Sequence, residues 1–458
     1  MERIIDKKQI NKKLLTIALP IAIQGVVSAT LGMIDDLMVG FLGETELAAV
    51  GVGTQLTMIH YMLIFGMISG TATFMAQFYG SGDMKSIRKC VGFSITVLMA
   101  TGVVFFIAAY FFAEDILSFY TKDQAVIALG AEYLRTLSPQ FLFLAFAAPA
   151  EMSFKATQQT KVPMIVSAIV FSTNTFFNYV LIFGKFGAPA LGVKGAAIAT
   201  AFARLLQVLI DLWFLRSKRN VFSGSFKSYF GWKPEFIRRI IKNSTPTTLN
   251  ELLWALGQTM FAAAFNRIGT TDYAAYQAAN SISNILAFAS FSVGDASLIM
   301  IGQKLGENEK EEAWGISKHL LKVGVIVGIV TGAIIAATAS PASSLFKLTE
   351  LGQSYTFYVL LVIGVTQPLS LYNGMQIVGV LRGGGDTRFA MIAESSCVWL
   401  VAVPIAFAAA LIWHLPIYIA FLLTRIEDVV KCVIITWRYM SKKWMNIVIE
   451  GIGSDTKA

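Results

Sequence analysis

Residues 91–112, VGFSITVLMATGVVFFIAAYFF, contain no charged side chain. An α-helix rises about 1.5 Å per residue, so this stretch is long enough to cross the roughly 30 Å hydrocarbon core of a membrane once. Hydrophobic residues make up 55% of the chain and charged residues only 14%, well below the roughly 25% charged residues of a typical soluble domain. The sequence therefore predicts a membrane-embedded protein.

Similar apolar stretches recur along the whole chain, separated by charged residues, glycine and proline. They predict twelve membrane-spanning helices, which begin near residues 14, 46, 91, 127, 163, 193, 244, 273, 319, 354, 389 and 416. The longest hydrophilic stretch, about 216 to 243, is too short for a separate soluble domain. We expect an all-α polytopic membrane protein.

Basic residues concentrate in the N-terminus and in the even-numbered connections, as in Lys85, Arg88 and Lys89 and in the stretch 216–243. Cytoplasmic loops are typically rich in lysine and arginine, so we expect a multi-pass protein of the cell (inner or plasma) membrane with both termini in the cytoplasm. The net charge of +9 then reflects loops beside inner-leaflet lipids, and it does not indicate nucleic-acid binding.

The sequence does not indicate an enzyme or a nucleotide-binding protein. GSGDMKS at 80–86 is too short for a phosphate-binding Walker A loop, and RGGGDTR at 382–388 lacks the strand-then-helix context of a dinucleotide site. The three cysteines and three histidines are far apart, which argues against disulfides and a zinc site. We therefore expect no cofactor and no catalytic residues.

The second half of the chain repeats landmarks of the first half at an offset of 226 residues. Three pairs keep this register: Pro20 with Pro246, Gln77 with Gln303, and Gly80 with Gly306. Six helices per half is an even number, so the two halves point the same way and are related by a pseudo-twofold axis along the membrane normal. The expected parts are an N-terminal lobe (1–216), a basic cytoplasmic linker (217–243) and a C-terminal lobe (244–458), with a central cleft between the lobes.

Two adjacent acids, Asp35 and Asp36, interrupt the first apolar stretch. A carboxylate in hydrocarbon is costly, so it indicates a functional site. At about 100° per residue, Asp35 shares a helix face with Gln24, whereas Asp36 is rotated away from that face. Polar faces of such helices are turned towards the protein interior, which favours a site role for Asp35. The alternative is a solvated acid at the outer interface, and this is the interpretation we prefer for Asp36.

The second half carries two acids of its own within expected helices, Glu251 and Asp295. Glu251 is nearly in phase with Gln258, and Asp295 is in phase with Gln277 and Asn284. We predict that both acids contact an ion or a substrate and that the three amides are accessory residues. Gln24 and Asp36 of the first helix are further candidate accessory residues.

Pro20 and Pro246 occupy matching places in the two halves and each removes a helical hydrogen bond. They are predicted hinges for a rearrangement of the lobes, and the alternative is that they mark fixed kinks.

Four stretches resemble the multidrug and toxic compound extrusion (MATE) transporters: DDLMVGFLGETELAAVGVG (35–53), NTFFNYVLIFG (174–184), LGVKGAAIATAFAR (191–204) and LRGGGDTRFAMI (381–392). The resemblance extends from about residue 14 to 440. It implies secondary antiport, in which protons or sodium ions enter while cationic, amphipathic organic compounds leave. A monomer is expected.

The resemblance also implies roles for individual residues. It identifies Asp35 as the ion-linked carboxylate of the first helix and places Asn174 and Asn178 beside it, and it matches Glu251 more loosely to an acid of the seventh helix. Sodium could bind at Asp35 or Glu251. The alternative role of the two amides is to join helices by hydrogen bonds.

Acids outnumber bases within the expected helices, where Arg135, Arg204, Arg425 and Lys431 are the basic residues and most lie near an end. A cavity with uncompensated carboxylates attracts cations. This expectation argues against the alternative function, a lipid-linked saccharide flippase of the same broader superfamily, whose anionic cargo calls for basic residues.

Overall fold

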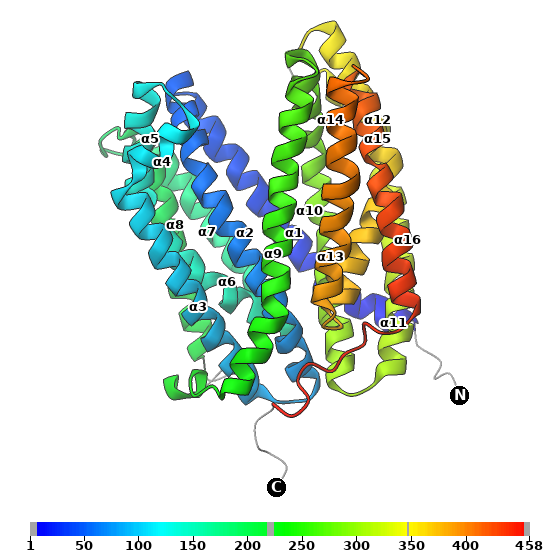
Figure 1. Cartoon of the computed structure of the whole chain (residues 1–458). Coiled ribbons are helices and arrows are strands. Elements are labelled where there is room, and N and C mark those ends of the chain that lie inside the picture. Colours follow the sequence, from blue (N-terminus) through cyan, green and yellow to red (C-terminus); the bar gives the residue numbers. More distant parts are fainter. Residues whose placement is uncertain (1–6, 218–223, 346–347, 453–458) are drawn as a thin grey trace.

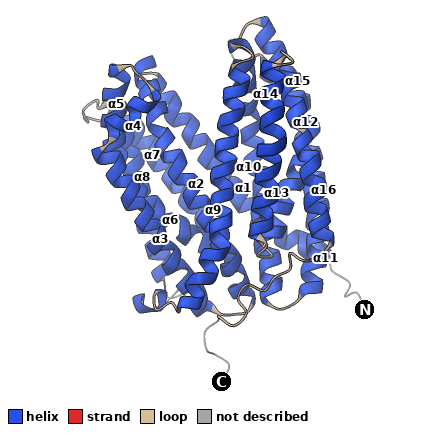
Figure 2. Ribbon diagram, in the orientation of Figure 1, coloured by secondary structure: helices blue, strands red, loops and turns tan. Residues whose placement is uncertain are grey.

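The computed structural model describes residues 7–217, 224–345 and 348–452, with only the backbone described for 285–290. Within these ranges every regular element is a helix, which confirms the predicted all-α fold (Figures 1 and 2). Parts of the expected domains lie outside the described residues, namely 1–6, 218–223, 346–347 and 453–458. The domain limits given above therefore stay predictions.

Eight helices follow one another in the N-terminal half, here called the N-terminal lobe. They are α1 (Lys7–Gly40), α2 (Glu44–Gly80), α3 (Met84–Phe111), α4 (Ala113–Tyr120), α5 (Gln124–Leu137), α6 (Gln140–Ala156), α7 (Lys161–Phe183) and α8 (Gly192–Arg216). The short helix η1 (Phe226–Tyr229) leads to the C-terminal lobe.

The C-terminal lobe begins with four long helices and continues with shorter helices and two segments wound as π-helix. Its elements are α9 (Pro234–Asn266), α10 (Thr270–Gly306), α11 (Lys310–Ser343), α12 (Glu350–Gly374), η2 (Met375–Arg382), α13 (Thr387–Cys397), η3 (Val398–Ala402), α14 (Val403–Leu411), α15 (Ile417–Thr424) and α16 (Ile426–Met440).

In the described part of the chain, eight helical segments are long and apolar enough to span a membrane. They are α1, α2, α3, α7, α8, α11, α12 with η2, and α13 with η3 and α14. Other expected spans are interrupted or more polar: Pro139 separates α5 from α6, and α9 carries Asn250 and Glu251. The expected count of twelve spans stays a prediction.

Both glycine-rich motifs form turns in the structure. In GSGDMKS, the side chain of Asp83 accepts a hydrogen bond from the backbone N–H of Ser86 at 3.0 Å and thereby caps α3. In RGGGDTR, Gly385 has φ +73°, which favours glycine, and the carboxylate of Asp386 pairs with Arg438 Nε at 2.6 Å. These contacts account for both motifs as turn and loop-packing elements.

The proline in α1 has a local compensation. Pro20 lacks an N–H, so the carbonyl of Thr16, four residues earlier, loses its helical donor. Thr160 at the start of α7 donates its hydroxyl to that carbonyl at 3.2 Å. Helix α1 continues through Pro20, as α9 does through Pro246, and the hinge role of both prolines stays a prediction.

The lobes contact each other through equivalent pairs of helices, since α1 packs on α10 and α9 packs on α2. The first turns of α1 lie against the C-terminal lobe, where Lys13 Nζ donates to Gln303 Oε1 at 3.1 Å and Asn11 bonds to His319 at 2.6 Å. From there α1 crosses to the N-terminal lobe, where it packs on α7 (Figure 1).

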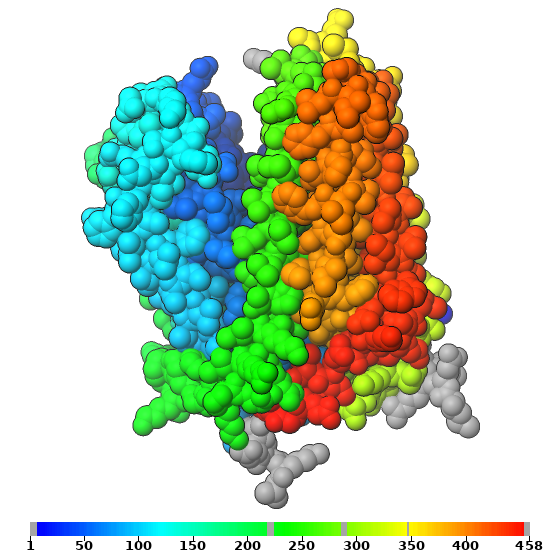
Figure 3. All heavy atoms as spheres, viewed as in Figure 1, coloured from blue at the N-terminus to red at the C-terminus, as the bar shows by residue number. Residues whose placement is uncertain are grey.

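The two lobes diverge on one side of the molecule. Both chain termini lie at the same end, here called the termini side, and the opposite end is called the cleft side (Figure 1). Figure 3 shows the surface hollowed on the cleft side, between α2 and α9, and filled on the termini side. The arrangement provides a central cleft that is open at one end only.

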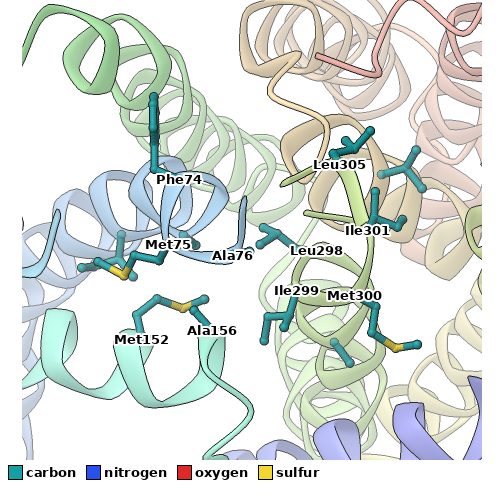
Figure 4. Close-up of a cluster of buried hydrophobic side chains, with 14 of the residues drawn as sticks. Phe74, Met75, Ala76, Met152, Ala156, Leu298, Ile299, Met300, Ile301 and Leu305 are labelled. Atoms are coloured by element: carbon teal, nitrogen blue, oxygen red, sulfur yellow. The ribbon is translucent and has the colours of Figure 1, made fainter. Parts of the chain in front are cut away.

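Buried apolar side chains close the termini side. Figure 4 shows those of α2 and α6 facing those of α10: Phe74, Met75, Ala76, Met152, Ala156, Leu298, Ile299, Met300, Ile301 and Leu305. These residues come from both lobes and belong to one core cluster, so the core of the protein continues across the lobe boundary.

Candidate functional site

The strongest candidate site surrounds Asp35 near the end of α1. Asn178 Nδ2 donates to Asp35 Oδ1 at 2.5 Å and to Asn174 Oδ1 at 2.9 Å. Asn174 in turn donates to the hydroxyl of Thr200 on α8 at 3.1 Å. The predicted residues Asp35, Asn174 and Asn178 are therefore brought together, and they join α1, α7 and α8.

One atom of this network is left without a partner. The Asn178 side chain is fully buried, and its Oδ1 makes no hydrogen bond to any described residue. An unpaired buried acceptor costs about 1–3 kcal/mol. A proton carried by Asp35 could be donated to such an oxygen, and oxygen atoms of carboxylates and amides are also the ligands of hard cations. The arrangement can therefore hold a proton or a small cation.

Asp36 differs from Asp35 in its surroundings. Its side chain is exposed, whereas that of Asp35 is partly buried. This difference agrees with the expectation that Asp35 faces the protein interior and Asp36 does not. Gln24, on the same face as Asp35, is buried but hydrogen-bonds to Glu151 of α6. Eleven residues of helix correspond to roughly 16 Å, so Gln24 and Asp35 belong to different parts of the site.

The acid of α9 has a cationic partner. Arg382 Nη2 lies 2.7 Å from Glu251 Oε1 and 3.9 Å from Glu394 Oε2. Asn250 Nδ2 donates to Glu394 at 2.6 Å. Glu251 is therefore not an uncompensated carboxylate, because Arg382, which was not among the basic residues expected within the helices, lies beside it.

A second pair was also missed. Lys155 Nζ lies 2.7 Å from Glu151 Oε1, one turn earlier on α6. Lys155 also interacts electrostatically with Asp295 of α10, which belongs to the other lobe. The spacing of Glu151 and Lys155, four residues apart within the apolar stretch 140–156, is the signal that could have revealed this pair.

The remaining predicted residues lie outside these networks. Gln258 is partly exposed on α9, and Gln277 and Asn284 are exposed on α10. Their accessory role stays a prediction.

The described site is therefore divided. Asp35 and its amides lie within the N-terminal lobe, whereas Glu251 and Asp295 interact with basic residues close to the lobe boundary. We call Glu251 and Asp295 the inner acids. Glu251 shares its basic partner Arg382 with Glu394, and Asp295 shares its basic partner Lys155 with Glu151. Further bases interact electrostatically with these second carboxylates, Arg204 with Glu151 and Lys431 with Glu394. Both clusters therefore combine acids and bases, and a positively charged ligand competes with protein cations for the acids.

A family model described as MatE matches residues 20–180 and 246–408. Probable multidrug resistance protein YoeA of Bacillus subtilis is 27% identical over 414 residues, which cover 88% of this chain and 87% of that protein. Probable multidrug resistance protein NorM of Thermotoga maritima is 24% identical over 440 residues, which cover 95% of this chain and 93% of that protein.

Two solved structures share the fold. A crystal structure of MATE in complex with MaL6 aligns with a TM-score of 0.86 at 19% identity and covers 95% of this chain and 97% of that one. An outward-facing multidrug resistance MATE family transporter of the MOP superfamily aligns with a TM-score of 0.85 at 18% identity and the same coverage. Because the family model covers more than half of the sequence, the resemblance seen in its motifs is confirmed and the chain belongs to the MatE family.

Proposed function

We propose that the protein is a secondary antiporter that exports cationic, amphipathic organic compounds in exchange for protons or sodium ions. The observation that carries the proposal is the Asp35 site, where a carboxylate within a membrane-spanning helix lies beside an unpaired amide oxygen of Asn178. The multidrug resistance relatives support this class of cargo.

The mechanism uses one carboxylate for two ligands in turn. A proton or sodium ion that enters through the cleft neutralises Asp35, so a bound organic cation loses its electrostatic partner and leaves. After the lobes rearrange, cargo from the other side displaces the ion. Each elementary charge that moves through 100 mV is worth about 2.3 kcal/mol, so importing more positive charge than is exported drives efflux.

The proposed orientation places both termini in the cytoplasm and the cleft side towards the outside. Basic side chains on the termini side include Lys85, Lys89 and Arg238, as the distribution of positive charge in cytoplasmic loops requires. In this orientation the structure corresponds to an outward-open state of a monomer in the cell membrane, with lipids around its exposed apolar side chains.

The alternative, a lipid-linked saccharide flippase, is not favoured. An anionic cargo needs basic groups that are free to bind it. Of the bases near the lobe boundary, Lys155 and Arg382 already pair with Glu151 and Glu251. Arg204 hydrogen-bonds to Gln207 and interacts electrostatically with Glu151 and Asp35. The named relatives are multidrug resistance proteins.

The decisive experiment measures efflux of a fluorescent organic cation from reconstituted vesicles under a proton gradient or a sodium gradient imposed separately. A tenfold gradient of a monovalent ion supplies about 1.4 kcal/mol, so one exchanged ion should sustain about a tenfold concentration difference of the dye. Acceleration by one gradient identifies the coupling ion. Efflux that responds to neither gradient would refute antiport.

A double-mutant cycle tests whether Asp35 and Glu251 share one ligand. The two acids have different partners, Asn178 and Arg382, so the losses in substrate binding from Asp35→Asn and Glu251→Gln should add to within about 0.5 kcal/mol. Dye affinity in detergent for the wild type, both single variants and the double variant gives this value. A clearly larger coupling energy would mean that one cation contacts both acids.

A further inference from the structure

We infer that Arg382 is a tethered internal cation that competes with the transported cation for Glu251 and Glu394, and that its displacement releases the contact between the lobes on the termini side. This inference rests on the proposed function and deepens it. It names the residue that links cation binding to the rearrangement of the lobes.

The first support is the position of the guanidinium between two acids from different helices. Arg382 is 1% exposed and contacts Glu251 of α9 at 2.7 Å and Glu394 of α13 at 3.9 Å. Glu394 also interacts electrostatically with Lys431 of α16, so Arg382 is above all the counter-charge of Glu251. A cation that approaches these acids must therefore compete with the Arg382 guanidinium for their oxygen atoms.

The second support is that the same residue reaches the other lobe. Arg382 Nη1 donates to Ser69 Oγ of α2 at 3.0 Å, and the backbone carbonyl of Arg382 accepts a hydrogen bond from Thr73 Oγ1 at 2.7 Å. Both bonds cross from the C-terminal to the N-terminal lobe. The guanidinium therefore connects the inner acids to the helix that lines the cleft.

The neighbouring contacts between α2 and α9 are equally close. Thr247 Oγ1 donates to the carbonyl of Gly66 at 2.7 Å, and Asn243 Nδ2 donates to the carbonyl of Gly70 at 2.9 Å. A Cβ atom on Gly70 would overlap Ser244, so the two helices meet almost backbone to backbone. Arg382 adds a charge-dependent bond beside these neutral hydrogen bonds.

The third support is the helical segment that carries the residue. Arg382 is the last residue of η2, which is wound as a π-helix. Such segments are rare and are frequent at functional sites. A change of winding in η2 would rotate Arg382 relative to α12, which provides a route for the guanidinium to leave the acids.

The cost of leaving buried carboxylates unpaired limits when Arg382 can leave Glu251. Removing a guanidinium from buried carboxylates without replacement is strongly unfavourable, because the remaining charges are uncompensated. Arg382 therefore leaves Glu251 only when a proton or another cation takes its place. The termini side then opens after a cation has bound, as strict exchange requires.

The test uses a reporter in the α2–α9 contact. Ser244 is 1% exposed and lies against Gly70, so Ser244→Cys is a near-isosteric reporter of opening on the termini side. It is placed in a chain whose native cysteines are replaced by alanine: Cys90, Cys397 and Cys432. Labelling by N-ethylmaleimide in detergent is measured with and without rhodamine 6G, and dye affinity is measured in parallel.

Three variants are compared. Arg382→Gln should bind the dye about tenfold more tightly, and its reporter should label about tenfold faster whether or not dye is present. Ser69→Ala keeps the pair with Glu251 and should label about threefold faster while still responding to dye. Arg425→Gln is the matched control. Arg425 pairs with Asp428 at the start of α16, within the C-terminal lobe, so this variant should behave as the wild type.

Unchanged dye affinity and slow, dye-dependent labelling in Arg382→Gln would overturn the inference. If that variant does not fold, wild-type labelling of Ser69→Ala overturns it. A wild-type protein that binds no organic cation contradicts the proposed function instead. In that case the dye-free labelling rates of the Arg382 and Ser69 variants still decide whether Arg382 holds the lobes together.

Discussion

Asp35→Asn is expected to reduce ion-driven dye efflux to the rate of passive leak, while the protein still inserts and folds. The substitution keeps the shape of the side chain and a hydrogen-bonding oxygen for Asn178, but it removes the charge. Two unit charges 4 Å apart interact by about 4 kcal/mol at an effective dielectric constant of 20, which corresponds to a loss of several hundredfold in affinity for a cation. Dye efflux from reconstituted vesicles measures this effect directly.

The neighbouring acid is the matched control. Asp36 lies next to Asp35 in the chain but is exposed, so Asp36→Asn should retain most of the efflux. Equal loss in the two variants would show that a general negative potential, rather than the Asp35 site, is responsible. Wild-type efflux by Asp35→Asn would remove Asp35 from the mechanism altogether.

The helical fold could be predicted because apolar length is a strong local signal. Each predicted start lies within ten residues of an observed helix start, and the largest errors, in α9 and α11, are early charged turns. The first turns of α1 carry lysines and precede the first predicted span, which begins near residue 14, yet they are helical and lie along the surface of the C-terminal lobe. Hydropathy marks what lies in the membrane and does not mark where a helix begins outside it.

The Asp35 site was predictable in part. Helical periodicity separated Asp35 from Asp36. The contact between α1 and α7 joins residues that are 143 positions apart, and no spacing rule gives such a pairing. It came from the family resemblance alone.

The basic partners of the inner acids were missed for a physical reason. Arg382 follows an apolar stretch directly and precedes three glycines, so its sequence context is that of a loop. In the structure η2 carries it into the interior, where Glu251 compensates its charge. Whether a buried charge is paired depends on tertiary contacts, and a single sequence does not contain them.

The closed termini side makes a second large effect testable. Helices α2 and α10 cross there through the two glycines of the internal repeat. A Cβ atom on Gly80 would overlap the backbone carbonyl oxygen of Gln303, and a Cβ atom on Gly306 would overlap that of Gln77. Two of the three residue pairs that define the 226-residue offset, Gln77 with Gln303 and Gly80 with Gly306, therefore form a twofold-related contact between the lobes.

Hydrogen bonds of the two glutamines support this crossing. Gln77 donates to the carbonyl of Asn446 at 2.9 Å, and Gln303 donates to the carbonyl of Ala156 at 2.9 Å. Each glutamine is almost fully buried and bonds to the opposite lobe. Closure of the termini side thus depends on a close approach of the α2 and α10 backbones that only glycine permits at positions 80 and 306.

Gly80→Ala and Gly306→Ala are expected to shift the population from the state that is open on the cleft side towards states that open on the termini side. Overpacking of this kind typically costs about 1–3 kcal/mol, or roughly 5- to 150-fold in the ratio of states. Spin labels at Lys122, between α4 and α5, and at Arg267, after α9, report the width of the cleft, because both positions are exposed on the cleft side. Their distance distribution should shift to shorter values.

Two glycines without crowding provide the controls. A Cβ atom on Gly51 of α2 meets no atom within 4 Å, and one on Gly294 of α10 meets only Val378 at 3.9 Å. Gly51→Ala and Gly294→Ala should therefore keep the wild-type distance distribution. If all four variants behaved alike, helix propensity rather than the crossing would explain the effect.

The size of the shift also distinguishes a strained crossing from an adaptable one. Reversing a 99:1 population needs about 5.5 kcal/mol, so one alanine should produce a mixture of states rather than a complete switch.

Gly80 and Gly306 contact the same pair of backbone segments, and once the first alanine has separated the helices, the second meets less resistance. The double variant should therefore shift the population by less than the sum of the single variants. Unchanged distances in properly folded Gly80→Ala and Gly306→Ala proteins would mean that the helices can move apart there without opening the termini side.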